Sequence, residues 1–286
     1  MEARGFAQKV TRRLLGSRPV QVFNHEFKQR VLEPFLAKVG ARPIKYIPVR
    51  SDQLSLEHGY DDEIQIKESV QKVRNNTMAT FERLATLWQQ VRYLDRYGIE
   101  GSLVECGVWK GGTIGMMALG HMASHPQNHR EIHLFDSFEG LPEPIEKDGK
   151  MAFWYAKKKA HGTLSSIGKC VGTLDENKNL FRTINYPEDK VNFHVGWFQD
   201  VLPKVAPSLG PIALLRLDGD WYESTMVCLK HLYPKVVKGG VIVIDDYGHW
   251  EGCKKAVDEF IATLKSPVLL GHIDYSGRYW IKLEDA

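Results

Sequence analysis

The sequence predicts an α/β protein built on a doubly wound, mostly parallel sheet whose final strand is reversed. From about residue 77, short apolar segments alternate with helical ones. Continuous apolar strands separated by helices are typical of a parallel sheet that is covered on both faces. The last two apolar segments, 268–273 and 278–282, are joined only by residues 274–277, which is too short a connection for a crossover helix. These two strands must therefore be antiparallel neighbours.

The individual elements follow in a regular order. The first is a helix over 77–97, in which apolar residues such as Phe81, Leu84 and Trp88 recur at helical spacing. Strands are expected at 102–106, 132–135, 191–195, 212–217 and 241–244, and further helices at 113–121, 174–184, 224–237 and 252–264. A Rossmann-like sheet with a reversed C-terminal strand is the architecture of class I methyltransferases, whereas a nicotinamide-binding Rossmann domain normally keeps its strands parallel there.

Two segments fall outside this alternation. Residues 1–76 mix basic, aromatic and turn-forming residues, and we interpret them as an N-terminal helical extension, with a helix around 19–38, that caps the substrate site. Residues 77–286 then form the methyltransferase domain. Within it, the long, lysine-rich segment 143–190 could be a lid or a disordered insert. We interpret it as a lid insert, because it follows a strand end, where ligands bind in this kind of sheet.

The composition is that of an ordinary globular protein. The net charge of +3 comes from scattered residues, which disfavours nucleic acid as a partner. The four cysteines show no C-x-x-C spacing, so we expect buried free thiols in a reducing compartment, the cytoplasm. We see neither a signal-peptide pattern nor an apolar run long enough to span a bilayer, and we expect no stable membrane insertion.

A glycine-rich turn follows the first strand and contains Glu105, Gly107, Trp109 and Gly111. Glycines at a strand-to-helix turn let a ligand approach the backbone closely, although a tight packing turn would use them as well. Asp136 ends the next strand, where a carboxylate can accept hydrogen bonds from both ribose hydroxyls of a nucleoside. The two elements in this order favour a nucleoside-binding site.

The charges near this turn indicate which nucleoside ligand it would take. Glu105 would repel a pyrophosphate group, but it suits the cationic amino and sulfonium groups of S-adenosylmethionine. Ser137 and Phe138 follow Asp136 directly, and the phenyl ring could lie against adenine. S-adenosylmethionine is therefore the expected cofactor.

Acidic residues follow two further strands. Asp218 and Asp220 come after 212–217, and Asp245 and Asp246 come after 241–244. Because parallel strands end at one edge of the sheet, we expect Asp218, Asp245 and Asp246 to converge. Their mutual repulsion requires a cation, and all-oxygen ligands select a hard ion, Mg²⁺ first and then Mn²⁺ or Ca²⁺. Helix N-caps or ion pairs with lysine or arginine are the alternative explanation.

Aromatic residues near these motifs have two explanations. Trp109, Trp197 and Trp221 could frame a ligand, or they could pack in the core or at the rim of the site. We include Trp109 and Trp197 among the expected cofactor-binding residues. His249 is better explained as a loop histidine than as a ligand or a base.

The ordered set of motifs resembles the macrocin O-methyltransferase family, whose TylF/MycF-type members methylate deoxysugar hydroxyls. The resemblance runs from about Thr77 to Phe260. It rests on Glu-Cys-Gly-Val-Trp-Lys-Gly-Gly at 105–112, Asp-Ser-Phe-Glu-Gly-Leu-Pro at 136–142, Gly-Trp-Phe-Gln-Asp-Val-Leu-Pro at 196–203, Leu-Asp-Gly-Asp-Trp-Tyr-Glu-Ser-Thr at 217–225 and Ile-Asp-Asp-Tyr-Gly-His at 244–249.

The resemblance implies a class I fold, S-adenosylmethionine and a divalent metal. It implies Asp218, Asp245 and Asp246 as metal ligands and Asp220 as the general base. Thr77 and Met78 resemble a Thr-Met pair that lies near the cofactor in the family. Members of the family commonly assemble, so the resemblance also implies a homo-oligomer.

These observations lead to the hypothesis of a Mg²⁺-dependent O-methyltransferase that acts on a sugar hydroxyl of a natural-product glycoside or a polysaccharide. The metal would lower the pKa of the acceptor hydroxyl, and Asp220 would take its proton. Two alternatives stay open. Catechol-type methyl transfer would use the same metal site for a phenolic diol, and the D-x-D sequence at 218–220 also occurs in metal-dependent glycosyltransferases. A non-catalytic binding module fits least, because it would not need the acidic residues.

Overall fold

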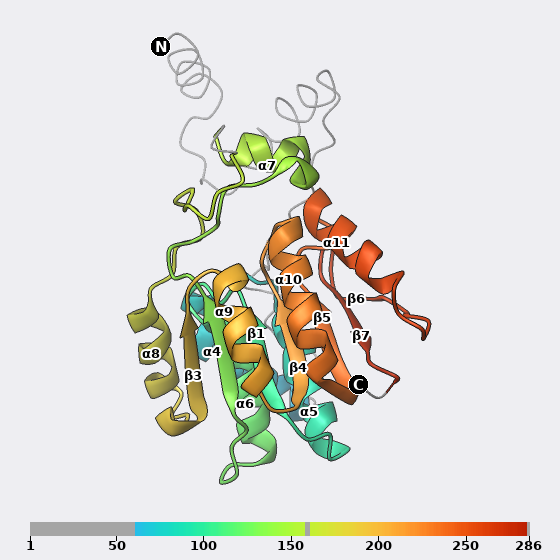
Figure 1. The fold of residues 1–286 in the computed structure, drawn as a ribbon. Coiled ribbons are helices and arrows are strands. Elements are labelled where there is room, and N and C mark those ends of the chain that lie inside the picture. The colour runs from blue at the N-terminus through green and yellow to red at the C-terminus, as the bar shows by residue number, and fades with distance from the viewer. Residues whose placement is uncertain (1–60, 158–160, 285–286) are drawn as a thin grey trace, which may run out of the picture. The chain divides into compact units, whose positions relative to one another are not determined.

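The computed structural model describes residues 61–157 and 161–284, which belong to one compact unit. These residues form a seven-stranded sheet with the order β3-β2-β1-β4-β5-β7-β6 (Figure 1). The strands are β1 (Ser102–Cys106), β2 (Ile132–Asp136), β3 (Val191–Val195), β4 (Ile212–Leu217), β5 (Val236–Ile244), β6 (Gly271–His272) and β7 (Arg278–Ile281). Strands β1 to β5 are parallel, and β7 is antiparallel to both of its neighbours, β5 and β6. The predicted fold class, including its reversed strand, is confirmed.

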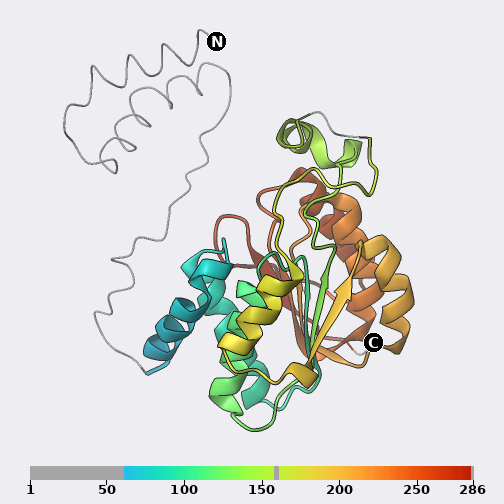
Figure 2. The same cartoon turned by 90° about the vertical axis from the view of Figure 1, so that its left-hand side faces the viewer.

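Helices cover both faces of the sheet (Figure 2). The helices are α4 (Asp61–Val73), α5 (Phe81–Arg96), α6 (Gly112–Ser124), α7 (Gly149–Tyr155), α8 (Leu174–Thr183), α9 (Phe198–Val205), α10 (Tyr222–Leu232) and α11 (Glu251–Ile261). Buried residues of α4, α5, α6 and α8 form one hydrophobic cluster with the sheet. Those of α9, α10 and α11 form a second cluster on the opposite face.

Successive side chains of a strand point to opposite faces, and this alternation decides which groups meet. On β4, Leu214 packs in the first cluster, whereas Leu215 and Leu217 pack in the second. Arg216 therefore lies on the face covered by α5 and α6, although it sits in an otherwise apolar strand. Its partner in register on β1 is Glu105. The buried middle of the sheet thus contains an ion pair (Arg216–Glu105) that the apolar pattern of the strand does not suggest.

Helix α5 begins at Phe81 rather than at residue 77, because Thr80 caps it. The Thr80 hydroxyl accepts a hydrogen bond of 3.2 Å from the Arg83 amide, which is the usual role of an N-cap. Before it lies α4, which places Ile66, Val70 and Val73 in the first cluster. The boundary predicted after residue 76 therefore falls inside this unit. The helix predicted around 19–38 lies outside the described residues, and the role of a substrate cap stays a prediction.

The segment predicted as a lid consists of two different parts. Its second part contains α8, as expected from the sequence, and Leu180 and Phe181 of this helix are buried against the sheet. Its first part is held to Leu141, just before the segment: the Leu141 amide donates to the Lys169 carbonyl (3.0 Å), and the Ile167 amide donates to the Leu141 carbonyl (2.9 Å). These bonds join the two limbs of a stem that leads to α7, beyond the edge of the sheet (Figure 1).

Two further expectations concern membranes and thiols. Among the described residues, no helix is both long and apolar enough to cross a membrane. Cys106, Cys228 and Cys253 are buried free thiols, as predicted, whereas Cys170 is half-buried.

A histidine pair at the edge of the sheet predicts how stability depends on pH. Nδ1 of His133 on β2 lies 3.1 Å from Nε2 of His194 on β3. Burial, and then the neighbouring His194, lower the pKa of His133 to about 4, and burial lowers that of His194. The unfolded chain binds a proton on each ring near pH 6.5, so stability should be complete above that pH and decrease as the pH falls towards 4.

Thermal denaturation between pH 7.5 and 4.5 tests this prediction. The His133→Gln variant should show a smaller decrease in Tm across this range than the unmodified protein, because the imidazole whose pKa is lowered to about 4 is removed. Parallel curves for the two proteins would contradict the assignment of the pH dependence to this pair.

Candidate active site

The predicted cofactor turn and the predicted acidic residues meet at the carboxyl edge of the sheet. Strands β1, β4 and β5 are direct neighbours, so the loops that follow them begin side by side. Gly107 has a φ of +83°, and a Cβ atom there would lie 1.8 Å from the Asp218 carbonyl oxygen. Only glycine fits such an approach. The turn after β1 and the loop after β4 are thus in backbone contact.

Three carboxylates gather just beyond this contact. Oxygens of Asp218, Asp220 and Asp246 all lie within 4.8 Å of one another. Asp246 is 7% exposed, and within the described residues its Oδ2 has no hydrogen-bond partner. Burial raises the pKa of Asp246, and the charges of Asp220 and Asp218 raise it further. A cation in this place would relieve both the repulsion and the unsatisfied oxygen.

Asp245, the third predicted metal ligand, lies in a different environment. Its Oδ1 accepts from Arg216 of β4, and its Oδ2 accepts from Arg83 of α5. This is the ion-pair alternative that the sequence left open for the acidic residues. Of the predicted metal set, the structure brings Asp218 and Asp246 together with Asp220, while Asp245 stands beside them with both oxygens bound to arginine.

Arg216 connects the two halves of the site. It is 1% exposed, and it bonds Glu105 and Asp245 and lies 3.0 Å from an oxygen of Asp218. Glu105 is fully buried, and its Oε1 also accepts from the Thr113 hydroxyl at 2.7 Å. Its Oε2 has no partner among the described residues. Burial raises the pKa of Glu105 to about 7, against the opposing charge of Arg216.

Sequence reasoning missed Arg216 and Arg83. The signal for Arg216 was present, because a charged residue inside the apolar strand Ile212–Leu217 must have a buried partner. Arg83 gave no such signal, since an arginine in an amphipathic helix is ordinarily exposed. It is buried against Asp245 and Asp274, which belong to loops 162 and 191 residues further along the chain, so the sequence around Arg83 gives no sign of these partners.

The backbone and surroundings of Asp220 are unusual. Its φ is +56°, in the left-handed region that costs free energy for residues other than glycine and is enriched at functional sites. Its carboxylate accepts a hydrogen bond from the Trp250 indole. Burial, and then the charge of Asp218, raise the pKa of Asp220 to about 8. Trp221 packs against Trp250 in the core and donates to the Pro142 carbonyl, so packing explains this tryptophan.

Asp136 holds the turn after β1. Its Oδ2 accepts from the amides of Val108 (2.7 Å) and Trp109 (3.3 Å), and its Oδ1 accepts from the Phe138 amide (2.7 Å). Burial raises the pKa of Asp136, whereas these amides oppose the shift. The half-buried carboxylate thus fixes the turn and retains lone pairs for further donors. The Ser137 hydroxyl donates to the Gly140 carbonyl, which shapes the next loop.

The remaining predicted cofactor residues surround this turn. Thr77 lies against the start of α6, where a Cβ on Gly112 would meet its side chain at 2.6 Å, and the adjacent Met78 is 60% exposed. Gly111 has a φ of +82°, and it also packs closely against Asn177 of α8. Trp109, Phe138 and Trp197 are half-buried, and the Trp109 indole donates to the Val171 carbonyl.

The stem below α7 contributes to the acidic side of the site. Asp148 accepts from the Tyr222 amide (2.6 Å) at the start of α10 and from the Ile145 amide (2.7 Å). Tyr155 of α7 packs against Trp250, the donor to Asp220. Burial, and then the adjacent Cys170, raise the pKa of Tyr155 to about 12, with a contribution from the charge of Asp220. The insert thus brings Tyr155 and Cys170 close to Asp220.

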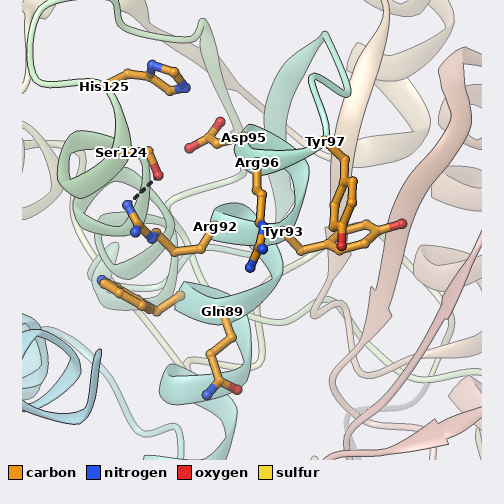
Figure 3. A pocket seen from close by; sticks show the side chains of 9 residues that line it. Gln89, Arg92, Tyr93, Asp95, Arg96, Tyr97, Ser124 and His125 are labelled. Atoms are coloured by element: carbon orange, nitrogen blue, oxygen red, sulfur yellow. Dashed lines mark hydrogen bonds between the residues drawn. The ribbon is translucent and has the colours of Figure 1, made fainter. Parts of the chain in front are cut away.

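A separate hollow of about 740 Å³ lies along the second half of α5 and the end of α6 (Figure 3). Arg92, which donates to the Ser124 hydroxyl at 2.8 Å, lines it together with Tyr93, Tyr97 and His125. Because α5 and α6 both start at the carboxyl edge of the sheet and end at the opposite edge, this hollow is remote from the acidic residues. It is not the candidate active site.

The strand order, the reversed β7 and a glycine turn facing acidic loops define a class I methyltransferase. The macrocin O-methyltransferase (TylF) family model matches residues 48–282. The chain belongs to this family, and it is therefore an O-methyltransferase.

Individual relatives agree with this assignment. The chain is 37% identical over 205 residues to demethyldecarbamoylnovobiocin O-methyltransferase from Streptomyces niveus, covering 72% of this chain and 75% of the relative. It is 33% identical over 205 residues to mycinamicin III 3''-O-methyltransferase from Micromonospora griseorubida, covering 72% of this chain and 78% of the relative. The solved structure of the O-methyltransferase NovP superposes with a TM-score of 0.62 at 34% identity, covering 73% of this chain and 83% of that one.

The contact between Gly107 and Asp218 gives a prediction about stability. Gly107→Ala should destabilise the fold by on the order of 3–5 kcal/mol, because the two loops must move apart. Gly98→Ala is the matched control: its φ is +63°, but nothing lies within 4 Å of the added carbon, so only the backbone cost of about 1–2 kcal/mol applies. Chemical denaturation measures both variants. Equal losses would mean that the contact is not close in solution.

Proposed function

We propose that this enzyme transfers a methyl group from S-adenosylmethionine to a sugar hydroxyl with the help of a divalent cation, Mg²⁺ in the first place. The observation that carries the proposal is the cluster of Asp218, Asp220 and Asp246 next to the turn after β1. The named activities of the relatives supply the acceptor class, since one acts on mycinamicin III at its 3'' position. The acceptor would be a small molecule or a glycan.

The donor atoms fit a hard divalent ion. The cluster offers only carboxylate oxygens, and one of them, Asp246 Oδ2, is buried without a partner among the described residues. Asp218 and Asp246 would be shared by any metal set here. The third protein ligand would be Asp245 according to the family resemblance, or Asp220 according to the distances in this structure. When bound, such an ion would orient the acceptor and lower the pKa of its hydroxyl.

The turn after β1 fits the cationic methyl donor. Glu105 Oε2 is fully buried and has no hydrogen-bond partner in the described part of the chain. The other oxygen of the same carboxylate, Oε1, pairs with Arg216. Asp136 retains lone pairs for ribose hydroxyls, and Met78 offers an exposed apolar side chain beside the start of α6. Thr77, Gly107, Trp109, Gly111, Ser137, Phe138 and Trp197 complete the proposed cofactor-binding set.

Asp220 is the proposed general base. A carboxylate with a raised pKa is a stronger proton acceptor, and proton transfer is most efficient when this pKa lies near the working pH. The Trp250 indole fixes one of its oxygens, which orients the other. Positioning of the acceptor against the methyl carbon would supply the rest of the rate gain. No covalent intermediate with the enzyme is needed.

Residues outside the sheet would select the acceptor. We assign this role to the insert, whose Tyr155 and Cys170 lie close to Asp220, and to the extension before the sheet domain. A homo-oligomer and a cytoplasmic location are parts of the same proposal, and the three buried thiols are compatible with a reducing compartment.

The direct test is methyl transfer with a panel of glycosides, polysaccharide fragments and catechols, with and without prior removal of metal by a chelator. We expect methylated glycosides only when Mg²⁺ or Mn²⁺ is restored. Preferred methylation of catechols would favour the phenolic alternative. Calorimetry should show binding of S-adenosylhomocysteine and none of a nucleotide-sugar, because membership of the O-methyltransferase family excludes the glycosyltransferase alternative. Undiminished activity after chelation would refute the metal.

The base assignment predicts a specific kinetic effect. Asp220→Asn should lower kcat on the order of 10²–10⁴-fold, because the amide cannot accept the proton. Its affinity for S-adenosylhomocysteine should stay near normal, since Asp220 is not placed at the cofactor turn. Full turnover by this variant would exclude Asp220 as the base.

The two possible metal sets can be separated by substitution. Asp246→Asn should weaken Mn²⁺ binding, measured by electron paramagnetic resonance, at least about tenfold, because a ligand charge is lost. If Asp245 acts as a counter-ion instead of a ligand, Asp245→Asn should lower thermal stability much more than Asp246→Asn, since Arg216 and Arg83 both lose a partner. Similar stability of the two variants, with equal loss of Mn²⁺, would identify Asp245 as a direct ligand.

A further inference from the structure

Arg83 joins three elements that are far apart in the sequence. It lies in the first turn of α5 and is 9% exposed. Its guanidinium bonds Asp245 after β5, and Nε lies 2.7 Å from an oxygen of Asp274 in the turn between β6 and β7. It also bonds the Ser276 hydroxyl, which in turn donates to the Asp245 carbonyl at 2.8 Å.

Asp274 is the second member of this connection. Its Oδ2 accepts both from Arg83 and from the hydroxyl of Thr80, the N-cap of α5, at 2.8 Å. Hydrogen bonds from Arg83 and from the Gly277 amide lower the pKa of Asp274 against the effect of burial, so it stays charged. Thr80 is the last residue of the short segment 77–80, which begins with Thr77 and Met78 and precedes α5.

The connection therefore runs from one half of the site to the other. At one end, Thr77 lies against the start of α6, beside the turn proposed to bind the cofactor. At the other end, Asp245 precedes Asp246, the buried member of the acidic cluster. Arg83 and Asp274 form the polar link between these ends. The planar guanidinium can hold both carboxylates in fixed orientations, which a lysine could not do.

We propose that Arg83, held by Asp274, is a positioning residue that couples the metal half of the site to the cofactor half. This inference rests on the proposed function. Arg83 fixes one oxygen of Asp245 and thereby the backbone that carries Asp246. It also fixes the start of α5, and the segment with Thr77 and Met78 leads directly into this start. A ligand that fixes the side chains in one half of the site should also fix those in the other half through Arg83. The metal and the cofactor should therefore each tighten the binding of the other by the same factor.

The experiment measures binding, not activity. Mn²⁺ affinity is determined by electron paramagnetic resonance in the absence and presence of saturating S-adenosylhomocysteine. For the unmodified protein we expect S-adenosylhomocysteine to tighten Mn²⁺ binding at least about fivefold. In Arg83→Gln this factor should fall to about 1, and Mn²⁺ binding should weaken roughly 10–100-fold, because the loop that carries Asp246 loses its outer support.

Two further variants separate positioning from general stability. Asp274→Asn keeps the shape of the turn and the charge of Arg83 but breaks their ion pair, so it should also reduce the coupling factor. Arg83→Lys should bind Mn²⁺ more tightly than Arg83→Gln but show almost as little coupling, because a lysine ammonium cannot hold both Asp245 and Asp274 in fixed orientations. Arg96→Gln, on the exposed end of the same helix, is the control and should leave both quantities unchanged.

Each outcome has a defined meaning. An unmodified protein that binds both ligands without coupling overturns the inference and leaves the proposed function intact, as does an unchanged coupling factor in folded Arg83→Gln or Asp274→Asn. An unmodified protein that binds neither Mn²⁺ nor S-adenosylhomocysteine overturns the proposed function and this inference with it. If Arg83→Gln does not fold, Asp274→Asn alone decides.

Discussion

The buried imbalance of charge at the carboxyl edge of the sheet governs the rest of this structure. Among the described residues, Arg216 and Arg83 lie against the carboxylates of Glu105, Asp218, Asp245 and Asp274 there, and Asp220 and Asp246 lie beside Asp218. Buried carboxylates that lack a counter-charge are costly. Arg216 and Arg83 neutralise one side of the group and leave Asp218, Asp220 and Asp246 facing one another. A methyl donor with a positive sulfonium and a divalent cation would supply the missing charge.

This imbalance also explains why the site needs a rigid frame. Carboxylates that repel one another separate unless the backbone prevents it. Here Gly107 packs against the Asp218 carbonyl, and the Leu217 carbonyl accepts from the Asp245 amide at 2.9 Å. Asp220 stays in a left-handed conformation that is unfavourable by itself. The free energy for this arrangement comes from the two apolar clusters that enclose the sheet. Stability of the core and geometry of the site are thus linked through the strand ends.

The sequence was sufficient for those features that depend on local pattern. Apolar strands, helical spacing and the short 274–277 connection predicted the parallel sheet and its reversed last strand, whereas the order of the strands comes from the structure. Glycine and aspartate at strand ends indicate which side chains can converge. The pattern was insufficient where partners lie far apart. Asp245 and Asp246 are identical neighbours in the sequence, yet alternation along the strand directs Asp245 to the α5 face, where Arg83 and Arg216 lie. Alternation indicates the face of the sheet, but the two arginines that bind Asp245 come from other elements, and the local sequence gives no sign of them.

The same reasoning explains how the insert divides. The sequence predicts one lid from a long polar segment after a strand, but Leu180 and Phe181 of α8 are buried in the first cluster. Only the stem and α7 can therefore project beyond the sheet edge. Asp148 ties this stem to the start of α10, and Tyr155 brings it to Trp250 beside Asp220. Since the acidic cluster and its frame are set by the sheet, a change in the stem would leave the charge balance of the cluster intact, which fits the proposed role of the insert in selecting the acceptor.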